Sequence, residues 1–352
     1  MNSERFDTLL NALANIKILV VGDGCLDMYW RADMMQSVLS RETPHFPLPI
    51  VDERYSLGAG SNIAADLTSL GCQTTMLTVI GEDWRGHLWT ALSQERGINI
   101  SHTLVDPSRW TPAYGKPIKI GISGEEFEEP RLDFTNRVPL PEPLEEEMCQ
   151  RLKKLGQETD AVIVSDQWTN GTITPRIREV INNLGDTRPV YVDSRTAISE
   201  DINVVLKPNE WEFAEAIGCS FLNIRMMPES EIVQLARKWM GTIRGPLCLT
   251  RADRGVMWID SSQVYMISAP EVAPPVDPVG AGDAFLTAFC ACRTAGGEIA
   301  EALLFGSLAS SIVLRKIGMT GNAKPDEMRQ EFRRYNKDSE RRSLVHEGIH
   351  SV

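Results

Sequence analysis

Residues 276–289 read VDPVGAGDAFLTAF, a stretch that places two carboxylates and two glycines directly before an apolar run. The apolar positions after Asp283 recur at helical spacing, so we predict that a helix begins close to Gly282. Glycines allow a tight turn, and they leave the first amides of such a helix free to bind an anion, phosphate above all. Asp283 would repel that anion unless it has a chemical task, such as taking a proton from an alcohol that attacks a phosphoryl group. The stretch therefore predicts either a phosphotransferase site or a plain glycine turn capped by aspartate.

The composition of the chain excludes several classes of protein. With 42% hydrophobic and 24% charged residues in 352, it is that of an ordinary soluble protein, and the net charge of -12 argues against nucleic acid or a membrane as a partner. No run of about 18 apolar residues occurs, and the N-terminus lacks a signal pattern. Seven cysteines without paired spacing indicate reduced thiols in the cytoplasm, and the histidines form no zinc-binding pattern.

Strand and helix patterns alternate along most of the chain. KILVVG at 17–22 is a continuous apolar run of the kind found in strands that are buried on both faces, and AVIVSD at 161–166 is similar. After residue 166, such runs continue to alternate with amphipathic helical stretches. This alternation predicts an α/β fold with a mostly parallel central sheet and helices on both faces.

Two segments interrupt this alternation. Residues 31–56 are rich in proline, and residues 98–137 contain short strand-like pieces separated by glycine and proline. A small inserted sheet built from these segments could serve as a lid over a cleft or as an oligomer contact. We expect residues 1–323 to form one domain that includes this lid, and residues 324–352 to form a C-terminal helix and a tail.

Polar residues follow several of the predicted strands. The carboxyl ends of parallel strands meet at one edge of a sheet, where ligands bind in open α/β folds. The residues that we expect at this edge are Asp23, Asp27, Asp166, Asp193, Asn209 and Thr250. A glycine-rich turn at Gly58–Asn62 precedes a further helix, and it would let the backbone approach a ligand while Asn62 binds hydroxyl groups.

Asn209 and Glu212 lie three residues apart on a predicted first helical turn, so their side chains point the same way. Such a pair suits a hydrated Mg²⁺ ion held beside phosphates. N-capping of the helix explains Asn209 equally well.

Three of these motifs occur in the order in which the ribokinase-like carbohydrate kinases, the PfkB family, carry them. They are Gly58–Asn62, Asn209 with Glu212, and Asp277–Asp283, which matches the pattern DxxGAGD. The sequence resembles that family from residue 17 to about residue 320. The resemblance implies a ribokinase-like fold and an enzyme that transfers phosphate from ATP to a sugar hydroxyl. It also implies Mg²⁺ as a cofactor and leaves a monovalent cation open as a second one.

The resemblance assigns a role to individual residues. Asp283 would be the catalytic base, and the anion hole would be formed by Gly280, Ala281 and Gly282. Asn209 and Glu212 would organise magnesium and the phosphates. The residues that would contact the nucleotide are Asn209, Thr250, Arg251, Gly255 and Asp277. The residues that would bind sugar hydroxyls are Asp27, Gly58, Gly60 and Asn62.

Within the family, VVGDGCLDMYW, PRLDF and SDQWTNG look most like the kinases that phosphorylate C1 of D-glycero-D-manno-heptose 7-phosphate. On this basis the sugar site would also include Glu42, Arg131, Asp133 and Asp166. The sequence departs from these kinases at two places. The turn before Asn62 reads LGAGSN where they favour PGGAAN, and Asn170 stands where they usually carry lysine. No stretch after residue 323 is long enough for the nucleotidyltransferase half of the bifunctional heptose enzymes, so we expect a kinase domain only.

Other interpretations stay open. The protein could be a ribose, fructose or nucleoside kinase of the same fold, or a sugar or nucleotide sensor without catalytic activity. A cationic pocket for a substrate phosphate would decide in favour of a sugar phosphate, and Arg41 and Arg131 are the candidates for it. The exposed edges of the lid strands could also pair two copies in a homodimer.

Overall fold

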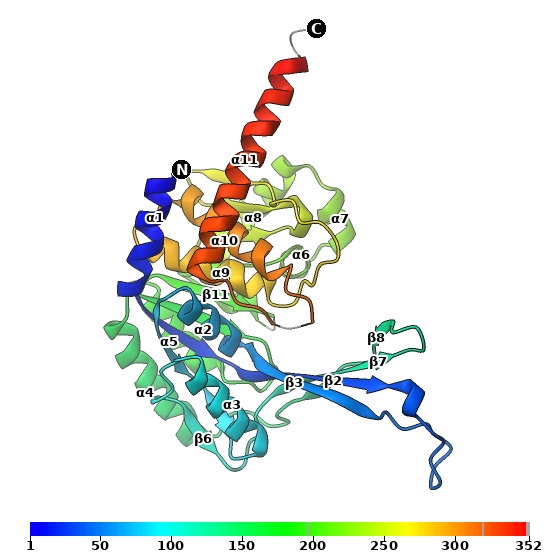
Figure 1. Cartoon of the computed structure of the whole chain (residues 1–352). Helices are drawn as coiled ribbons and strands as arrows, with labels where there is room; N and C mark the ends of the chain where they lie inside the picture. Colours follow the sequence, from blue (N-terminus) through cyan, green and yellow to red (C-terminus); the bar gives the residue numbers. More distant parts are fainter. Residues whose placement is uncertain (196, 319, 350–352) are drawn as a thin grey trace.

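The apolar runs of the sequence form the middle of an eight-stranded sheet with the order β15-β14-β13-β12-β11-β10-β1-β4 (Figure 1). The computed structural model describes residues 1–195, 197–318 and 320–349. The strands are β1 (Lys17–Gly22), β4 (Gln73–Leu77), β10 (Ala161–Asp166), β11 (Val190–Ser194), β12 (Val205–Leu206), β13 (Leu247–Thr250), β14 (Val256–Ile259) and β15 (Val264–Ile267). Pairing is parallel from β4 to β13, and β14 and β15 add an antiparallel hairpin at one end. The predicted α/β fold is confirmed.

Helices cover both faces of this sheet and bury one apolar cluster on each side. Ile18 and Val20 of β1 belong to one cluster, whereas the alternating Leu19 and Val21 belong to the other. The first face carries α1 (Ser3–Ala12), α2 (Gly60–Ser69), α3 (Trp84–Glu95), α9 (Ala281–Thr294), α10 (Ile299–Val313) and α11 (Pro325–Ile349). The second carries α4 (Glu142–Glu158), α5 (Pro175–Leu184), α6 (Glu210–Ala216), α7 (Phe221–Met226) and α8 (Glu229–Ile243).

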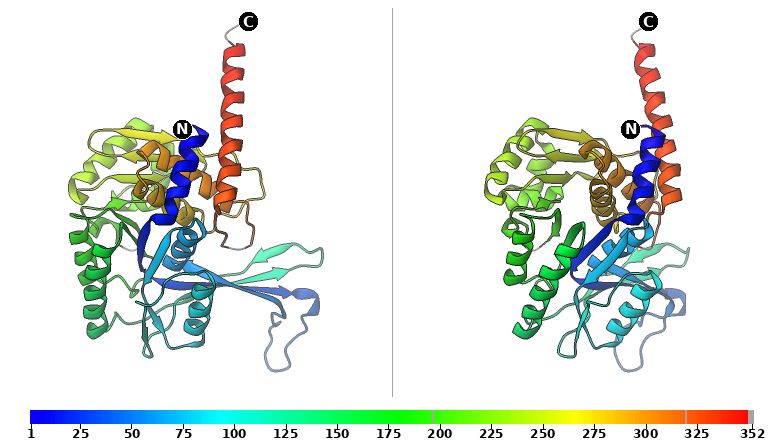
Figure 2. Two further views of the ribbon diagram at one scale, coloured as in Figure 1. Left: turned by 60° about the vertical axis from the view of Figure 1, so that its left-hand side comes forward. Right: turned by 90° about the vertical axis from the view of Figure 1, so that its left-hand side faces the viewer.

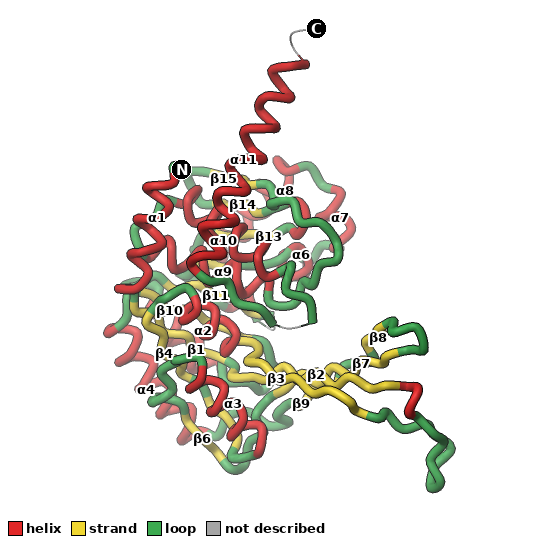
Figure 3. Tube along the Cα trace, in the orientation of Figure 1, coloured by secondary structure: helices red, strands yellow, loops and turns green. Residues whose placement is uncertain are grey.

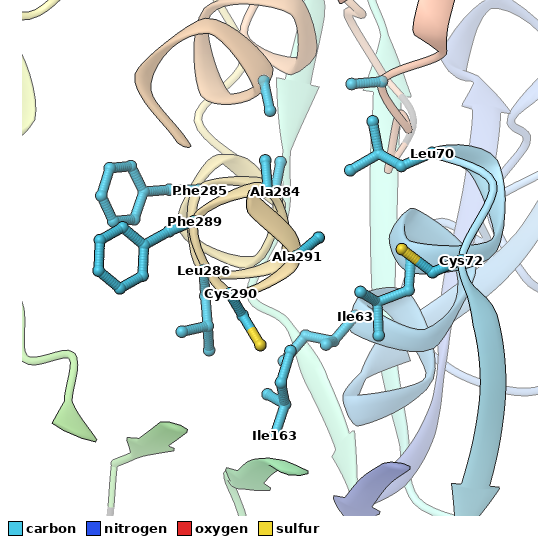
Figure 4. Close-up of a cluster of buried hydrophobic side chains, with 14 of the residues drawn as sticks. Ile63, Leu70, Cys72, Ile163, Ala284, Phe285, Leu286, Phe289, Cys290 and Ala291 are labelled. Atoms are coloured by element: carbon cyan, nitrogen blue, oxygen red, sulfur yellow. The ribbon is translucent and has the colours of Figure 1, made fainter. Parts of the chain in front are cut away.

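The helix that begins at the opening motif lies deep in the first cluster. Every residue of α9 from Ala284 to Cys292 is buried. Figure 4 shows Phe285 and Phe289 on one side of this helix and Ala291 on the other, and all three belong to the buried apolar cluster of the first face. Because α9 is enclosed on all sides, its first turn is held firmly in place.

A second, five-stranded sheet projects from the body as a lid (Figure 2). It consists of β2 (Gly24–Asp33), β3 (Ile50–Ala59), β7 (Ala113–Ile120), β8 (Glu126–Glu128) and β9 (Leu132–Phe134). The loop between β2 and β3 extends from the far end of this sheet (Figure 3).

The lid differs in two respects from the segments expected at 31–56 and 98–137. It begins earlier, at Gly24, so Asp27 lies within a lid strand instead of in a loop after β1. Residues Leu104–Asp106 (β6) instead pair with β5 (Val79–Gly81) in a separate two-stranded sheet. The pairing of β2 with β3 and β7 joins segments that are distant in the sequence, so no local pattern reveals it.

The two ends of the chain meet on the first face of the sheet. The ring of Phe6 stacks on Phe332 of α11 at 4.2 Å between centroids and lies 4.7 Å from Phe305 of α10. The helix α11 continues to Ile349, through most of the segment expected as a tail, and the final three residues lie outside the described residues. No described helix is both long enough and apolar enough to cross a membrane.

The turn from β3 into α2 holds a non-glycine residue in a conformation that favours glycine. Ala59 has φ of 49° and ψ of -132°. Its neighbours Gly58 and Gly60 leave little room for a side chain. A Cβ at Gly58 would lie 3.3 Å from the Asp27 carboxylate, and one at Gly60 would lie 3.1 Å from the Asp23 carbonyl oxygen. The turn therefore brings backbone close to Asp27, and Ala59 stores roughly 1–3 kcal/mol of strain.

We predict that Ala59→Gly stabilises the protein by about 1 kcal/mol, since relief of the strained φ outweighs the added flexibility of the unfolded chain. Urea denaturation measures the change. Ala65→Gly, in the interior of α2, is the matched control and should destabilise by about 1 kcal/mol. A lower urea midpoint for Ala59→Gly than for the wild type would show that the turn is not strained.

Candidate active site

The first turn of α9, together with Gly280 before it, has the geometry that we expect of an anion site, and we call it the anion-binding turn. Gly280 caps the helix at φ of 78°, and a Cβ there would lie 3.0 Å from Cγ2 of Thr320. The amide of Ala281 donates a 3.2 Å hydrogen bond to the carbonyl of Pro278. The amides of Gly282 and Asp283 have no acceptor among the described residues. These two amides lie at the positive end of the helix, so they are free to bind an anion.

Asp283 lies beside these amides, and Asn62 from the first turn of α2 positions it. The Nδ2 group of Asn62 donates a 2.8 Å hydrogen bond to Oδ2 of Asp283. The side chain of Asp283 lies at a cleft but is largely surrounded by protein. This burial, together with the nearby charge of Asp193, raises the pKa of Asp283 to about 7. A carboxyl with this pKa can accept a proton near neutral pH.

A buried ion pair completes this part of the site. Lys207, directly after β12, lies 3.2 Å from Oδ2 of Asp193 at the end of β11, and both residues are buried. Burial alone would lower the pKa of Lys207, but the charges of Asp193 and Glu212 raise it, so the ammonium stays charged. The pair places a positive charge near the anion-binding turn.

A cleft of about 560 Å³ lies between the lid and this edge of the main sheet. Asp27 is the carboxylate on the lid side of the cleft. It accepts a 2.9 Å hydrogen bond from Oγ1 of Thr320 and lies 3.3 Å from Nζ of Lys116, which in turn donates to the Tyr29 hydroxyl at 2.9 Å. Such paired donors and acceptors suit the recognition of sugar hydroxyls.

Arg131 also lines this cleft and is held by its neighbours in the lid. Its guanidinium pairs with Asp133 at 2.6 Å and lies 4.3 Å from the ring centroid of Tyr114. Tyr114 stacks on Trp168 at 4.4 Å, which joins the lid to the loop after β10. The arrangement fixes a cation on the lid wall.

A second, smaller cavity of about 160 Å³ lies on the other side of the anion-binding turn. Its lining includes Thr250, Gly255, Ser307 and Ser311, and Gly282 lines both cavities. The two cavities therefore meet at the turn that precedes Asp283.

The other nucleotide candidates have structural partners. Arg251 is buried and pairs with Glu210 at 3.4 Å and Glu229 at 2.9 Å, and it does not line the smaller cavity. Asp277 accepts hydrogen bonds from the backbone amides of Val279 and Gly318 at 3.0 and 2.9 Å. It thereby ties the anion-binding turn to the loop after α10.

Asn209 and Glu212 form a capping box at the start of α6. Oδ1 of Asn209 accepts from the Glu212 amide at 3.0 Å, and Oε2 of Glu212 accepts from the Asn209 amide at 2.8 Å. Burial raises the pKa of Glu212. Its second carboxylate oxygen accepts no hydrogen bond from the residues that the structure describes. Among the described residues, no group of three potential ligands forms a metal cage.

Of the predicted sugar-binding residues, Asp27 and Arg131 line the cleft. The residues that do not line it are Glu42, Gly58, Gly60, Asn62, Asp133 and Asp166. Asp166 is buried and pairs with Arg178 at 2.7 Å while accepting from Oγ of Ser194 at 2.6 Å. Glu42 lies with Arg41 in the exposed loop between β2 and β3. Both have the residue type that the site needs, but the fold places them elsewhere.

Sequence reasoning missed several residues of the site. They are Tyr29, Tyr114, Lys116, Gln167, Arg195, Lys207 and Thr320. Lys207 follows a short apolar strand and precedes Asn209, so the rule for polar residues at strand ends could have found it. Thr320 is separated from Asp27 by most of the chain and carries no local signal.

Comparisons with known proteins give a consistent result. Residues 170–326 match the pfkB family of carbohydrate kinases. The chain is 30% identical to the bifunctional protein HldE of Trichlorobacter lovleyi over 93% of its own length, and it spans only 65% of that relative. It is 27% identical to the D-beta-D-heptose 7-phosphate kinase of Bordetella bronchiseptica, over 87% of this chain and 93% of the relative.

Solved structures share the fold. Phosphofructokinase-2 of Escherichia coli superposes with a TM-score of 0.70 at 17% identity, over 90% of this chain and 98% of the other. Ribokinase of Thermotoga maritima superposes with a TM-score of 0.66 at 20% identity, over 90% and 99%. The expected ribokinase-like fold is confirmed.

We predict that Asp283→Asn stabilises the protein more at pH 8 than at pH 5. The raised pKa means that the folded state favours the protonated carboxyl, so the wild type loses stability as pH rises from about 4 toward 7. Asparagine at position 283 carries no charge, and its side-chain oxygen can still accept the hydrogen bond from Asn62. Thermal denaturation at the two pH values measures the difference.

Asp326→Asn is the control, because the side chain of Asp326 is 97% exposed and its replacement should have a similar small effect at both pH values. An equal effect of Asp283→Asn at pH 5 and pH 8 would contradict the raised pKa.

Proposed function

From the match of residues 170–326 to the pfkB family of carbohydrate kinases, we propose that the protein transfers the γ-phosphoryl group of ATP to the C1 hydroxyl of D-glycero-D-manno-heptose 7-phosphate. One observation carries the kinase part of this proposal. Asp283, with a pKa of about 7, lies beside the free amides of α9, where the two cavities meet. This places a base and an anion site at a single point.

The chemistry follows from this geometry. The sugar lies in the larger cleft, and the nucleotide lies in the smaller cavity, with its terminal phosphate at the turn shared by both. Asp283 accepts the hydroxyl proton while the sugar oxygen attacks the phosphorus in line with the leaving oxygen of ADP. The amides of Gly282 and Asp283 hold the charge that develops on the phosphoryl oxygens. Lys207 adds a positive charge nearby.

Bound Mg²⁺ would neutralise part of the charge on the ATP phosphates. The free carboxylate oxygen of Glu212 is the group on this chain that fits a hydrated ion beside them. Asn209 positions Glu212 through the capping box and thereby supports this role indirectly.

A substrate that already carries a phosphate fits the lid wall. The Nη1 group of Arg131 takes no part in the pairing with Asp133, so it can donate to a phosphate oxygen. The kinase from Bordetella bronchiseptica, named for heptose 7-phosphate, supports the particular sugar. Arg131 lines the cleft and Arg41 does not, which favours Arg131 as the cation for a substrate phosphate.

We expect a coupled ADP-release screen with Mg²⁺ to show turnover of heptose 7-phosphate above that of free hexoses, free pentoses and nucleosides. Asp283→Asn should lower kcat by at least about 10²-fold, since a positioned base contributes roughly 10²–10⁴-fold, while ATP binding stays nearly intact. Comparing the rate in potassium salts with the rate in tetramethylammonium salts in the same assay tests whether activity depends on a monovalent cation.

Turnover of unphosphorylated sugars with none of heptose 7-phosphate would refute the proposed substrate but leave the kinase activity standing. A variant Asp283→Asn that keeps more than half the wild-type kcat would refute the role of Asp283 as base.

We also propose a cytoplasmic enzyme that forms a homodimer through the lid. The cytoplasmic assignment rests on cysteines without paired spacing. The dimer is supported by exposed apolar side chains on the lid and its loop, among them Phe46, Ile50, Val51 and Phe127. Light scattering should give twice the chain mass for the wild type and a lower mass for Val51→Lys, and a monomeric wild type would exclude the dimer.

A further inference from the structure

Arg195 is a cation of the cleft that none of the motifs singled out. It follows the last residue of β11 and lines the cleft together with Gly282 and Asp283. Its backbone amide donates a 2.9 Å hydrogen bond to the carbonyl of Asp166, which fixes the chain at this point. The side chain itself is exposed toward the cleft.

The order of the strands places Arg195 between the two halves of the site. On one side, Gln167 directly follows the end of β10 and lines the sugar cleft. On the other, β12 leads to Lys207 and then to the capping box at the start of α6. The end of β11 lies between them, so Arg195 stands at the border between sugar and nucleotide.

The electrostatic influence of Arg195 agrees with this position. Burial raises the pKa of Tyr114 on the lid and of Glu212 on α6, and the charge of Arg195 opposes the rise in both. The guanidinium therefore lies near enough to Tyr114 on the lid and to Glu212 on α6 to influence both of them.

The charge of Arg195 is also uncompensated. Each of the other cations of the site forms an ion pair. These pairs are Lys116–Asp27 at 3.3 Å, Arg131–Asp133 at 2.6 Å and Lys207–Asp193 at 3.2 Å. Arg195 forms no ion pair with any residue in the described part of the chain. A guanidinium that is free in this way can meet negative charge that a substrate brings.

We propose that Arg195 is a catalytic residue that contacts the transferred phosphoryl group and stabilises its charge in the transition state. The inference rests on the proposed phosphoryl transfer but not on the identity of the sugar. The bond between sugar oxygen and phosphorus forms as the bond to the leaving oxygen of ADP breaks, and Asp283 takes the hydroxyl proton. Arg195 loses no proton and forms no covalent bond. Its planar fork can donate two parallel hydrogen bonds to two phosphoryl oxygens, a geometry that the ammonium group of lysine does not offer.

The test compares Arg195→Ala and Arg195→Lys with the wild type, using the sugar that the wild-type protein phosphorylates best. Arg195→Ala should lower kcat by about 10²–10³-fold, while KM for the sugar changes by less than about threefold. The kcat of Arg195→Lys should lie between the kcat of Arg195→Ala and that of the wild type. Added guanidinium ion should raise the kcat of Arg195→Ala but not that of Asp283→Asn.

Arg188→Ala is the matched control, because Arg188 is an exposed arginine just before the opposite end of the same strand, where it donates to the carbonyl of Gln157. Its kcat should equal that of the wild type. An unchanged kcat for Arg195→Ala, with a raised KM only for phosphorylated sugars, would make Arg195 an anchor for the substrate phosphate and overturn the proposal. Loss of kcat without rescue by guanidinium would make it a structural residue. A wild-type protein that phosphorylates no sugar would refute the proposed function itself.

Discussion

The hydrogen bond from Asn62 to Asp283 joins the first turns of two helices, α2 and α9, and the rest of the site depends on it. Each helix follows a glycine-rich turn, and the glycines let both turns approach each other and Asp27 closely. Because α9 is buried from Ala284 to Cys292, the backbone that carries Asp283 is held in place. The carboxyl therefore keeps a raised pKa, which is what a base at neutral pH requires.

The lid adds a second constraint. Asp27 lies on β2, which begins two residues after β1 of the main sheet ends. The short connection to β1 fixes the position of the Asp27 carboxylate at the cleft. Thr320, from the loop after α10, and Lys116, from a neighbouring lid strand, both contact it. Three segments that are distant in the sequence thus meet at the carboxylate of Asp27. Through it, the lid contacts the loop that follows α10.

Motifs that are contiguous in the sequence were readable in advance. The turn before Asp283 was predicted as a helix start, and α9 begins at Ala281. The alternation of strands and helices predicted the parallel sheet, because the period of apolar residues depends on burial of each element and not on its neighbours. Asn209 with Glu212 illustrates the limit, since the capping box makes the pair necessary for α6 whether or not magnesium binds.

Isolated residues were not readable in this way. Asp166 is the last residue of β10 and Arg195 directly follows β11, yet Asp166 is buried against Arg178 whereas Arg195 faces the cleft. In the sequence, both are charged residues at the end of a strand, so the same pattern predicts both as site residues. The packing of neighbouring helices decides which of the two is buried and which faces the cleft. Local chemistry thus dictates the anion-binding turn and the class of fold, because glycine conformation and apolar period act over a few residues. Which charged side chains gather around the substrate depends on the folded chain, because contacts between distant segments decide which charges are neutralised and which stay free.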